Sequence, residues 1–174
     1  MKAFFLDRDG VINIDNGYVY KIEDFIFENS IFEALRFVQD KGFDIIIITN
    51  QSGISRGLYT ESDFLNLTNW MLAEFEKNGI KIMSVEFCPH LPNDNCSCRK
   101  PNTGLLERLI NNFNIDRYNS WIVGDKYSDI ELAVNANIPN AIFIGKASLM
   151  DNKKVPINLK VMCQLSEITK FDYL

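Results

Sequence analysis

The sequence predicts an α/β protein in which a parallel sheet carries helices on both faces, a three-layer Rossmann-like fold. Short apolar segments typical of strands alternate along the chain with segments whose apolar residues recur at helical spacing. That alternation is typical of parallel sheets covered by helices. Polar and acidic residues also follow directly after several strand-like segments, where the ligand sites of such sheets lie.

Length and composition favour one globular domain. We expect it to span residues 1–174, because a domain usually contains about 100–200 residues. The chain is 47% hydrophobic and 24% charged, which excludes a largely disordered protein. Lys and Arg number 18 against 23 Asp and Glu, giving a net charge of −5 without a basic stripe. This balance argues against broad binding to nucleic acid or to an anionic membrane.

The apolar runs and the N-terminus indicate a cellular location. No apolar run reaches the roughly 18–20 residues that span a bilayer, and the N-terminus lacks the apolar core of a signal peptide. We therefore expect a cytoplasmic protein with reduced thiols and no membrane partner. We also expect a monomer.

The first strand, at residues 2–6, is a short apolar run that ends in an acidic loop. A helix is predicted over 30–40, where Ser30 can cap it and Gly42 stops it. A β-branched strand follows at 44–49. The apolar face of the helix consists of Ile31, Ala34, Leu35 and Val38.

The next helix opens at Thr60, which forms a capping box with Asp63, and ends at Asn78-Gly79. Strand and helix then continue to alternate. The later strands are predicted at 81–88, 120–123, 141–144 and 159–163, and the later helices at 103–113 and 129–136.

Three strand ends carry groups suited to a metal and an anion. Asp7 and Asp9 follow the first strand, Thr49 ends the second, and Asp125 follows a later strand. Carboxylates grouped in this way suit Mg²⁺, and one of them could attack phosphorus while its neighbour transfers protons. An isolated pair of aspartates two residues apart is more often turn chemistry. A lysine such as Lys100 is also more often a solvated side chain.

The ordered set of motifs is more specific than any one of them. It resembles the four motifs of the haloacid dehalogenase superfamily of phosphatases and, more closely, the heptose bisphosphate phosphatase subfamily and the related histidinol-phosphatase domain. The segments that carry the resemblance are 7–12, 49–57, 67–71, 88–90, 96–101 and 124–129.

This resemblance implies a capless haloacid dehalogenase fold, because the gaps after the first two motifs are too short for a cap domain. It implies that Asp7 is the nucleophile and Asp9 the general acid and base. Thr49 and Lys100 would hold the phosphoryl group. Asp7, Asp9 and Asp125 would bind Mg²⁺, with Asp7 using its side chain and Asp9 its backbone carbonyl.

The resemblance also implies the substrate contacts. Arg99 would recognise the sugar or a second phosphate. Asp129 would support the metal site or cap a helix, and we favour the first role. The remaining expected contacts are Asp15, Asn16, Gly17, Tyr18, Asn50, Gln51, Ser52 and Lys126.

A second metal site is predicted at residues 88–98. Cys88, His90, Cys96 and Cys98 supply four ligands that suit a closed, structural Zn²⁺ site, which would order the loop before Arg99. The alternative is a chance cluster of buried thiols. Cys163 lies far along the chain, and we expect it in the core.

We therefore expect a Mg²⁺-dependent phosphatase acting on a small sugar phosphate. The resemblance favours the 7-phosphate of D-glycero-D-manno-heptose 1,7-bisphosphate, in the supply of heptose for lipopolysaccharide. The alternatives are histidinol-phosphate phosphatase and a non-catalytic module that binds sugar phosphates. A polynucleotide 3′-phosphatase would need the basic groove that the sequence lacks.

Overall fold

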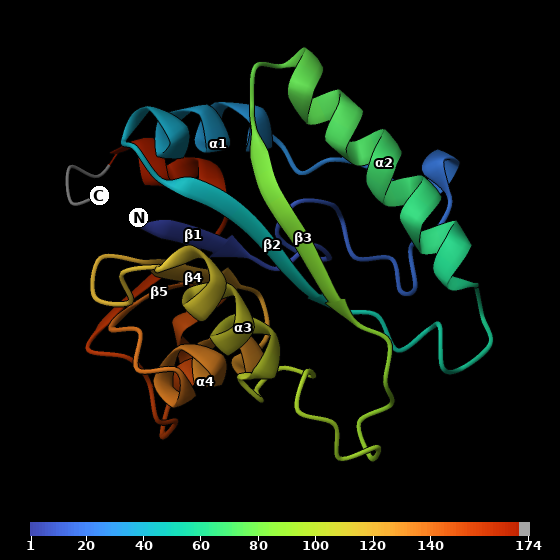
Figure 1. The fold of residues 1–174 in the computed structure, drawn as a ribbon. Helices are drawn as coiled ribbons and strands as arrows, with labels where there is room; N and C mark the ends of the chain where they lie inside the picture. The colour runs from blue at the N-terminus through green and yellow to red at the C-terminus, as the bar shows by residue number, and fades with distance from the viewer. Residues whose placement is uncertain (171–174) are drawn as a thin grey trace.

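The computed structural model describes residues 1–170 and contains one parallel sheet of six strands (Figure 1). The strand order is β3-β2-β1-β4-β5-β6, and every pairing is parallel. This confirms the predicted fold class. The predicted domain end at residue 174 lies outside the described residues. The strands are β1 (Ala3–Leu6), β2 (Asp44–Asn50), β3 (Ile82–Cys88), β4 (Trp121–Gly124), β5 (Asn140–Ile144) and β6 (Asn158–Met162).

Helices cover both faces of the sheet. One face carries α1 (Ile31–Asp40) and α2 (Glu61–Lys77), and the other carries α3 (Gly104–Phe113) and α4 (Tyr127–Asn135) (Figure 1). The short helix η3 (Leu165–Lys170) packs beside α1. No helix within residues 1–170 is both long enough and apolar enough to cross a membrane.

Strand β1 lies at the centre of the sheet and explains why the N-terminal run is wholly apolar. Successive side chains of a strand point to opposite faces. Phe4 and Leu6 therefore enter the core beneath α1 and α2, whereas Ala3 and Phe5 enter the core beneath α3 and α4. Neither face of β1 meets water, so polar residues begin only where the strand ends.

The strand order also fixes where a ligand can bind. From β1 the chain builds outward through β2 and β3 on one side, and later through β4, β5 and β6 on the other. The connections therefore diverge between β1 and β4, and a crevice opens beyond the carboxyl ends of those strands. The polar segments that follow β1, β2 and β4 meet there.

Several local expectations are corrected. Ser30 does not cap α1, because its backbone is left-handed (φ 59°, ψ 18°) and its side chain makes no capping hydrogen bond. Helix α4 begins at Tyr127, two residues before the predicted start. Cys163 is exposed rather than in the core. The short helices η1 (Ile22–Asp24), η2 (Ala147–Met150) and η3 were not predicted, since so few residues carry no periodic pattern.

The capping box at α2 is confirmed and gives a test of local stability. Thr60 Oγ1 accepts from the Asp63 backbone N–H at 3.1 Å, and Asp63 Oδ2 accepts from the Thr60 N–H at 2.8 Å. We expect Thr60→Ala to lower the free energy of unfolding by about 1 kcal/mol in urea titrations. Ser30→Gly is the matched comparison and should cause no loss, because glycine favours a left-handed backbone. A loss at Ser30 equal to that at Thr60 would contradict this assignment.

Candidate active site

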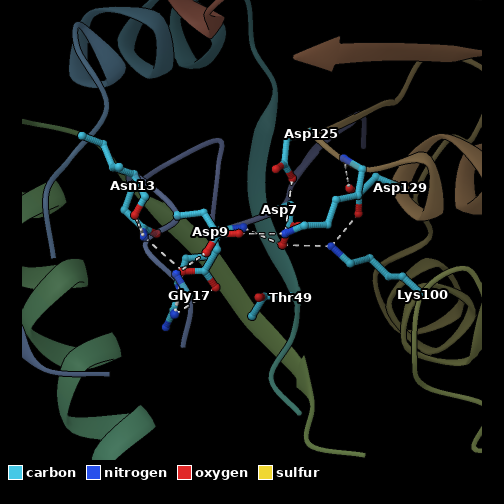
Figure 2. A network of polar contacts seen from close by, with 12 residues as sticks. Asp7, Asp9, Asn13, Gly17, Thr49, Lys100, Asp125 and Asp129 are labelled. Atoms are coloured by element: carbon cyan, nitrogen blue, oxygen red, sulfur yellow. Dashed lines mark hydrogen bonds and ion pairs between the residues drawn. The ribbon is translucent and has the colours of Figure 1, made fainter. Parts of the chain in front are cut away.

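A buried ion-pair network occupies the crevice at the ends of β1 and β4 (Figure 2). Lys100 Nζ lies 2.9 Å from Asp7 Oδ1 and 2.7 Å from Asp129 Oδ1, and it donates to the Ile48 carbonyl at 2.8 Å. An ammonium group is a donor only, and here it is surrounded by two carboxylate oxygens and one carbonyl oxygen. Lys100 is only 4% exposed, so the solvated lysine considered from the sequence is excluded.

Charge and burial oppose each other in this network. Burial raises the pKa of the Asp7 carboxyl and Lys100 acts to lower it, with burial the larger effect. Burial disfavours the charged Lys100, but the carboxylates of Asp129 and Asp7 outweigh that effect and raise its pKa. Lys100 is therefore held as a cation beside the oxygen that would attack a substrate.

Asp129 takes the helix-capping role that the sequence left open, and it also pairs with Lys100. Its Oδ2 accepts from the Lys126 backbone N–H at 3.1 Å and so caps the start of α4. Its Oδ1 pairs with Lys100. Gly124 allows this position, because a Cβ there would lie 2.2 Å from Asp129 Oδ2. Asp129 thus links the last motif to the Lys100 loop.

A carboxylate cluster suited to a cation lies beside the network. One oxygen each of Asp7, Asp125 and Asp129 lie within 4.8 Å of one another. Asp125 Oδ1 is buried and has no hydrogen-bond partner among residues 1–170; Lys126 Nζ lies 3.8 Å away. Burial, opposed by Lys126 and assisted by Asp7, raises the pKa of Asp125 to about 7. An unpartnered carboxylate among other carboxylates fits a hard divalent cation such as Mg²⁺.

Gly10 makes room for this cluster. Its backbone is left-handed (φ 88°), and a Cβ at this position would lie 2.3 Å from Asp125 Oδ2. The glycine after Asp9 is therefore required both by the turn and by the close approach of the Asp125 carboxylate.

The Asp9 carboxylate is held by three side chains. Arg8 Nη2 donates to both oxygens, at 2.9 and 3.0 Å. Asn13 Nδ2 donates to Oδ1 at 3.1 Å, and Gln51 Nε2 donates to Oδ2 at 3.0 Å. Asp9 lines the crevice together with Asp7.

The crevice is a cavity of about 290 Å³ that brings most of the predicted site together. Asn16 is exposed and is not among the lining residues, and Asp125 approaches from behind Gly10. Tyr59 and Ser128 also line the cavity and were not predicted from the sequence. The predicted residues in the lining are Asp7, Asp9, Asp15, Gly17, Tyr18, Thr49, Asn50, Gln51, Ser52, Arg99, Lys100 and Lys126.

Two loops form the outer rim of the cavity. Lys126 Nζ pairs with Asp15 Oδ2 at 3.0 Å, which joins the loop after β1 to the start of α4. Gly17 and Tyr18 both have left-handed backbones (φ 79° and 52°), and Tyr18 is 47% exposed. A left-handed tyrosine is uncommon, so the loop is shaped to present this ring at the rim.

The cysteine and histidine cluster forms as predicted. Cys98 Sγ lies 3.1 Å from both Cys88 Sγ and His90 Nδ1, and Cys96 Sγ lies 3.6 Å from Cys88 Sγ. All four ligand atoms lie within 4.8 Å of one another, as a single metal ion requires. Burial is the largest effect on the Cys88 thiol and raises its pKa, whereas a bound cation would stabilise the thiolate.

This cluster connects directly to the catalytic crevice. The loop packs tightly on the start of α3, where Gly104 N–H donates to the Ser97 carbonyl at 2.9 Å and a Cβ on Gly104 would clash with that oxygen. Arg99 Nη1 donates to the His90 carbonyl at 3.2 Å. The cluster is thus placed to fix the segment that delivers Arg99 and Lys100.

Comparison with known proteins agrees with this geometry. The family model described as polynucleotide kinase 3 phosphatase matches residues 2–148. The chain belongs to this family of haloacid dehalogenase-like phosphatases. It is therefore a phosphatase, and the alternative of a non-catalytic binding module is set aside.

Relatives of this phosphatase are named for one substrate. It is 50% identical over 145 residues to the D-glycero-alpha-D-manno-heptose-1,7-bisphosphate 7-phosphatase of Campylobacter jejuni, covering 83% of each chain. It is 42% identical over 149 residues to the beta-anomer enzyme of Yersinia pestis, covering 82% of this chain and 79% of the relative. The solved structure of the D,D-heptose 1,7-bisphosphate phosphatase of B. bronchiseptica, with magnesium and phosphate, superposes with a TM-score of 0.88. That pair is 26% identical, and the match covers 98% of this chain and 97% of the other.

The phosphatase contains functional contacts that sequence reasoning missed. Tyr59 donates to Gln51 Oε1 at 2.5 Å, and Gln51 Nε2 donates to Thr49 Oγ1 at 2.8 Å, so the ring orients the amide behind the second motif. Gly53 leaves space for Tyr59, since a Cβ there would lie 2.1 Å from the ring. A glycine inside the second motif was the only available signal, and it does not identify its partner.

The pKa of Asp125 predicts how cation binding depends on pH. A proton and Mg²⁺ compete for this carboxylate, so Mg²⁺ affinity should rise about tenfold per pH unit below about pH 7 and level off above it. Isothermal titration with MgCl₂ at intervals between about pH 6 and about pH 8 measures this. Asp125→Asn should weaken the pH dependence in this range and remove most of the affinity. A flat profile for the wild type would contradict the assignment.

Proposed function

We propose that this phosphatase removes the 7-phosphate of D-glycero-D-manno-heptose 1,7-bisphosphate through an aspartyl-phosphate on Asp7. The observation that carries the mechanism is the buried contact of Asp7 Oδ1 with Lys100, at the point where β1 ends. The substrate assignment is supported by similarity to the named heptose bisphosphate phosphatases. The cavity, with Arg99 and Lys126 beside the nucleophile, suits a substrate with two phosphates.

In the first step, a carboxylate oxygen of Asp7 attacks phosphorus and forms a new P–O bond. The bond between phosphorus and the sugar oxygen breaks, and Asp9 gives a proton to that departing oxygen. Lys100 and the Thr49 hydroxyl hold the phosphoryl oxygens as their charge develops. The Asp129 carboxylate keeps Lys100 charged and pointed at the nucleophile.

In the second step, Asp9 takes a proton from water, and the water oxygen attacks phosphorus. The bond from phosphorus to Asp7 breaks, which releases inorganic phosphate and restores the carboxylate. The side chains of Asp7 and Asp125 and the backbone carbonyl of Asp9 would hold Mg²⁺, which neutralises phosphoryl charge when bound.

Substrate recognition is assigned to the rim of the cavity. Arg99 and Lys126 are the cations available to a second phosphate, and Asp15, Gly17 and Tyr18 face the sugar. Asn50, Gln51 and Ser52 line the cavity together with Thr49. Asn16, which does not line the cavity, is not included among the contacts. On substrate binding, Lys126 would break its ion pair with Asp15 and pair with a substrate phosphate instead.

The proposal also assigns zinc and a cellular setting. Cys88, His90, Cys96 and Cys98 would bind a structural Zn²⁺, because four soft or borderline ligands leave no open position. All four cysteines are free thiols, in keeping with a reducing cytoplasm. The proposal also takes the protein to be a monomer with one domain over residues 1–174. The pathway served is the heptose supply for lipopolysaccharide.

Removing a zinc ligand should loosen the substrate-binding loop without touching the nucleophile. Cys96→Ser is expected to lose about one equivalent of zinc by elemental analysis and to raise KM more than it lowers kcat. Cys163→Ser is the matched control, since that cysteine is exposed and outside the cluster. Equal zinc content in the wild type and Cys96→Ser would contradict the site.

A substrate panel tests the proposed activity. Phosphate release with Mg²⁺ is measured for both anomers of heptose 1,7-bisphosphate, fructose 1,6-bisphosphate, histidinol phosphate and a 3′-phosphorylated oligonucleotide. We expect the highest kcat/KM on a heptose anomer, and a loss of at least about 10³-fold in Asp7→Asn because the nucleophile is gone. Asp40→Asn, an exposed carboxylate on α1, should retain full activity.

Each contrary outcome of the panel has its own meaning. Histidinol phosphate turned over far faster than the heptose substrates would replace the substrate assignment. Preference for the oligonucleotide would place the chain with the activity that names its family model. Full activity in Asp7→Asn would reject the covalent mechanism.

A further inference from the structure

Arg8 is the largest fully buried side chain of the described residues, and the proposed mechanism leaves it without a role. It is 1% exposed. Its guanidinium carbon lies 5.7 Å from the centre of the Phe64 ring and 6.0 Å from that of Phe25. A charge in such apolar surroundings is costly unless it is paired and hydrogen-bonded. The partner of Arg8 is Asp9.

The pairing fixes the plane of the Asp9 carboxylate. Arg8 Nη2 donates to both oxygens, Nε donates to Oδ1 at 3.2 Å, and Nη2 also donates to the Val19 carbonyl at 2.7 Å. Because the guanidinium is planar and rigid, several contacts along one edge specify an orientation as well as a distance. The Val19 carbonyl anchors the guanidinium in turn.

Arg8 also contacts the nucleophile through its backbone. Its N–H donates to Asp7 Oδ1 at 2.7 Å, while its side chain holds Asp9. Arg8 itself does not line the cavity. It therefore touches both reacting carboxylates from behind and does not touch the substrate.

Stability does not explain this arginine. Arg8 Nη1 is buried and has no hydrogen-bond partner among residues 1–170. Replacing a buried ion pair by well-packed apolar residues is often neutral or stabilising, so an incompletely satisfied pair is a poor device for stability alone. The contacts that Arg8 does make are the ones that orient Asp9.

We propose that Arg8 is a positioning residue that sets the orientation of Asp9 for proton transfer to the departing sugar oxygen. Arg8 holds one edge of the carboxylate, and Asn13 and Gln51 hold it from other sides. The inference rests on the proposed function, because it assigns a role within the same phosphoryl transfer. It follows that replacing Arg8 should slow the reaction more for a leaving group that needs a proton than for one that does not.

The test measures the rate at which each of two leaving groups is released in the first turnover, with Mg²⁺ at saturation. Heptose is a poor leaving group that needs the proton, whereas p-nitrophenolate departs without it. We expect Arg8→Met to slow sugar release by about 10²-fold, at the low end of the loss for general acid catalysis, and p-nitrophenol release by less than about threefold. Arg8→Lys should recover part of the sugar rate, because it keeps the charge but loses the rigid fork.

A double-mutant cycle distinguishes positioning from a structural effect. In an Asp9→Asn background, Arg8→Lys should add no further slowing, because the group that Arg8 orients is already lost. Inorganic phosphate affinity and the unfolding midpoint report whether the cavity stays intact. Equal slowing for both leaving groups, or additive slowing in the Asp9→Asn background, would overturn the proposal. If Arg8→Met does not fold, the comparison of the two release rates in Arg8→Lys alone tests the proposal.

Arg117 supplies a matched control. It pairs with both oxygens of Glu107, at 2.7 and 2.6 Å, and donates to the Ala136 carbonyl at 2.7 Å, as Arg8 does to Val19. Arg117→Met should lower the unfolding midpoint without changing the ratio of the two release rates. If the wild type turns over another alkyl phosphate and not heptose bisphosphate, the substrate assignment fails, and the Arg8 comparison is made on that alkyl phosphate.

Discussion

The site depends on one buried cation. Lys100 is 4% exposed, and its ammonium group meets two carboxylates and a carbonyl that belong to three different segments of the chain. Removing a charge from water is costly unless partners surround it. The end of β1, the end of β2 and the first turn of α4 must therefore converge on Lys100, and that convergence places the Asp7 carboxylate.

The parallel sheet makes this convergence possible. Strands β1, β2 and β4 are adjacent and parallel, so their carboxyl ends lie at one edge. Glycines at positions 10 and 124 then remove the side chains that would keep the carboxylates apart. Burial, assisted by the nearby carboxylates of Asp7 and Asp129, raises the pKa of Asp125 to about 7. A cation is the natural means of relieving that crowding of negative charge.

Two groups of residues support opposite sides of the crevice. One is the cysteine and histidine cluster with its loop, and the other is the set of side chains that hold Asp9. On one side, the Cys88 cluster and the start of α3 hold the segment before Lys100. On the other side, Arg8 and Gln51 donate hydrogen bonds to the Asp9 carboxylate, and Arg8 itself does not line the cavity. A small site without a cap domain gains its rigidity from these packed supports.

Sequence alone determined the order of strands and helices along the chain, the acidic pair at Asp7 and Asp9, and the members of the Cys and His cluster, because each is a local pattern or a motif in order. It could not reveal the burial of Arg8, the Tyr59 contact with Gln51 or the double role of Asp129. Each depends on where the folded chain places a side chain, which no local sequence pattern encodes. The predictions that Ser30 caps a helix and that Cys163 lies in the core were wrong for the same reason. Backbone conformation and burial at single positions are decided by the tertiary structure.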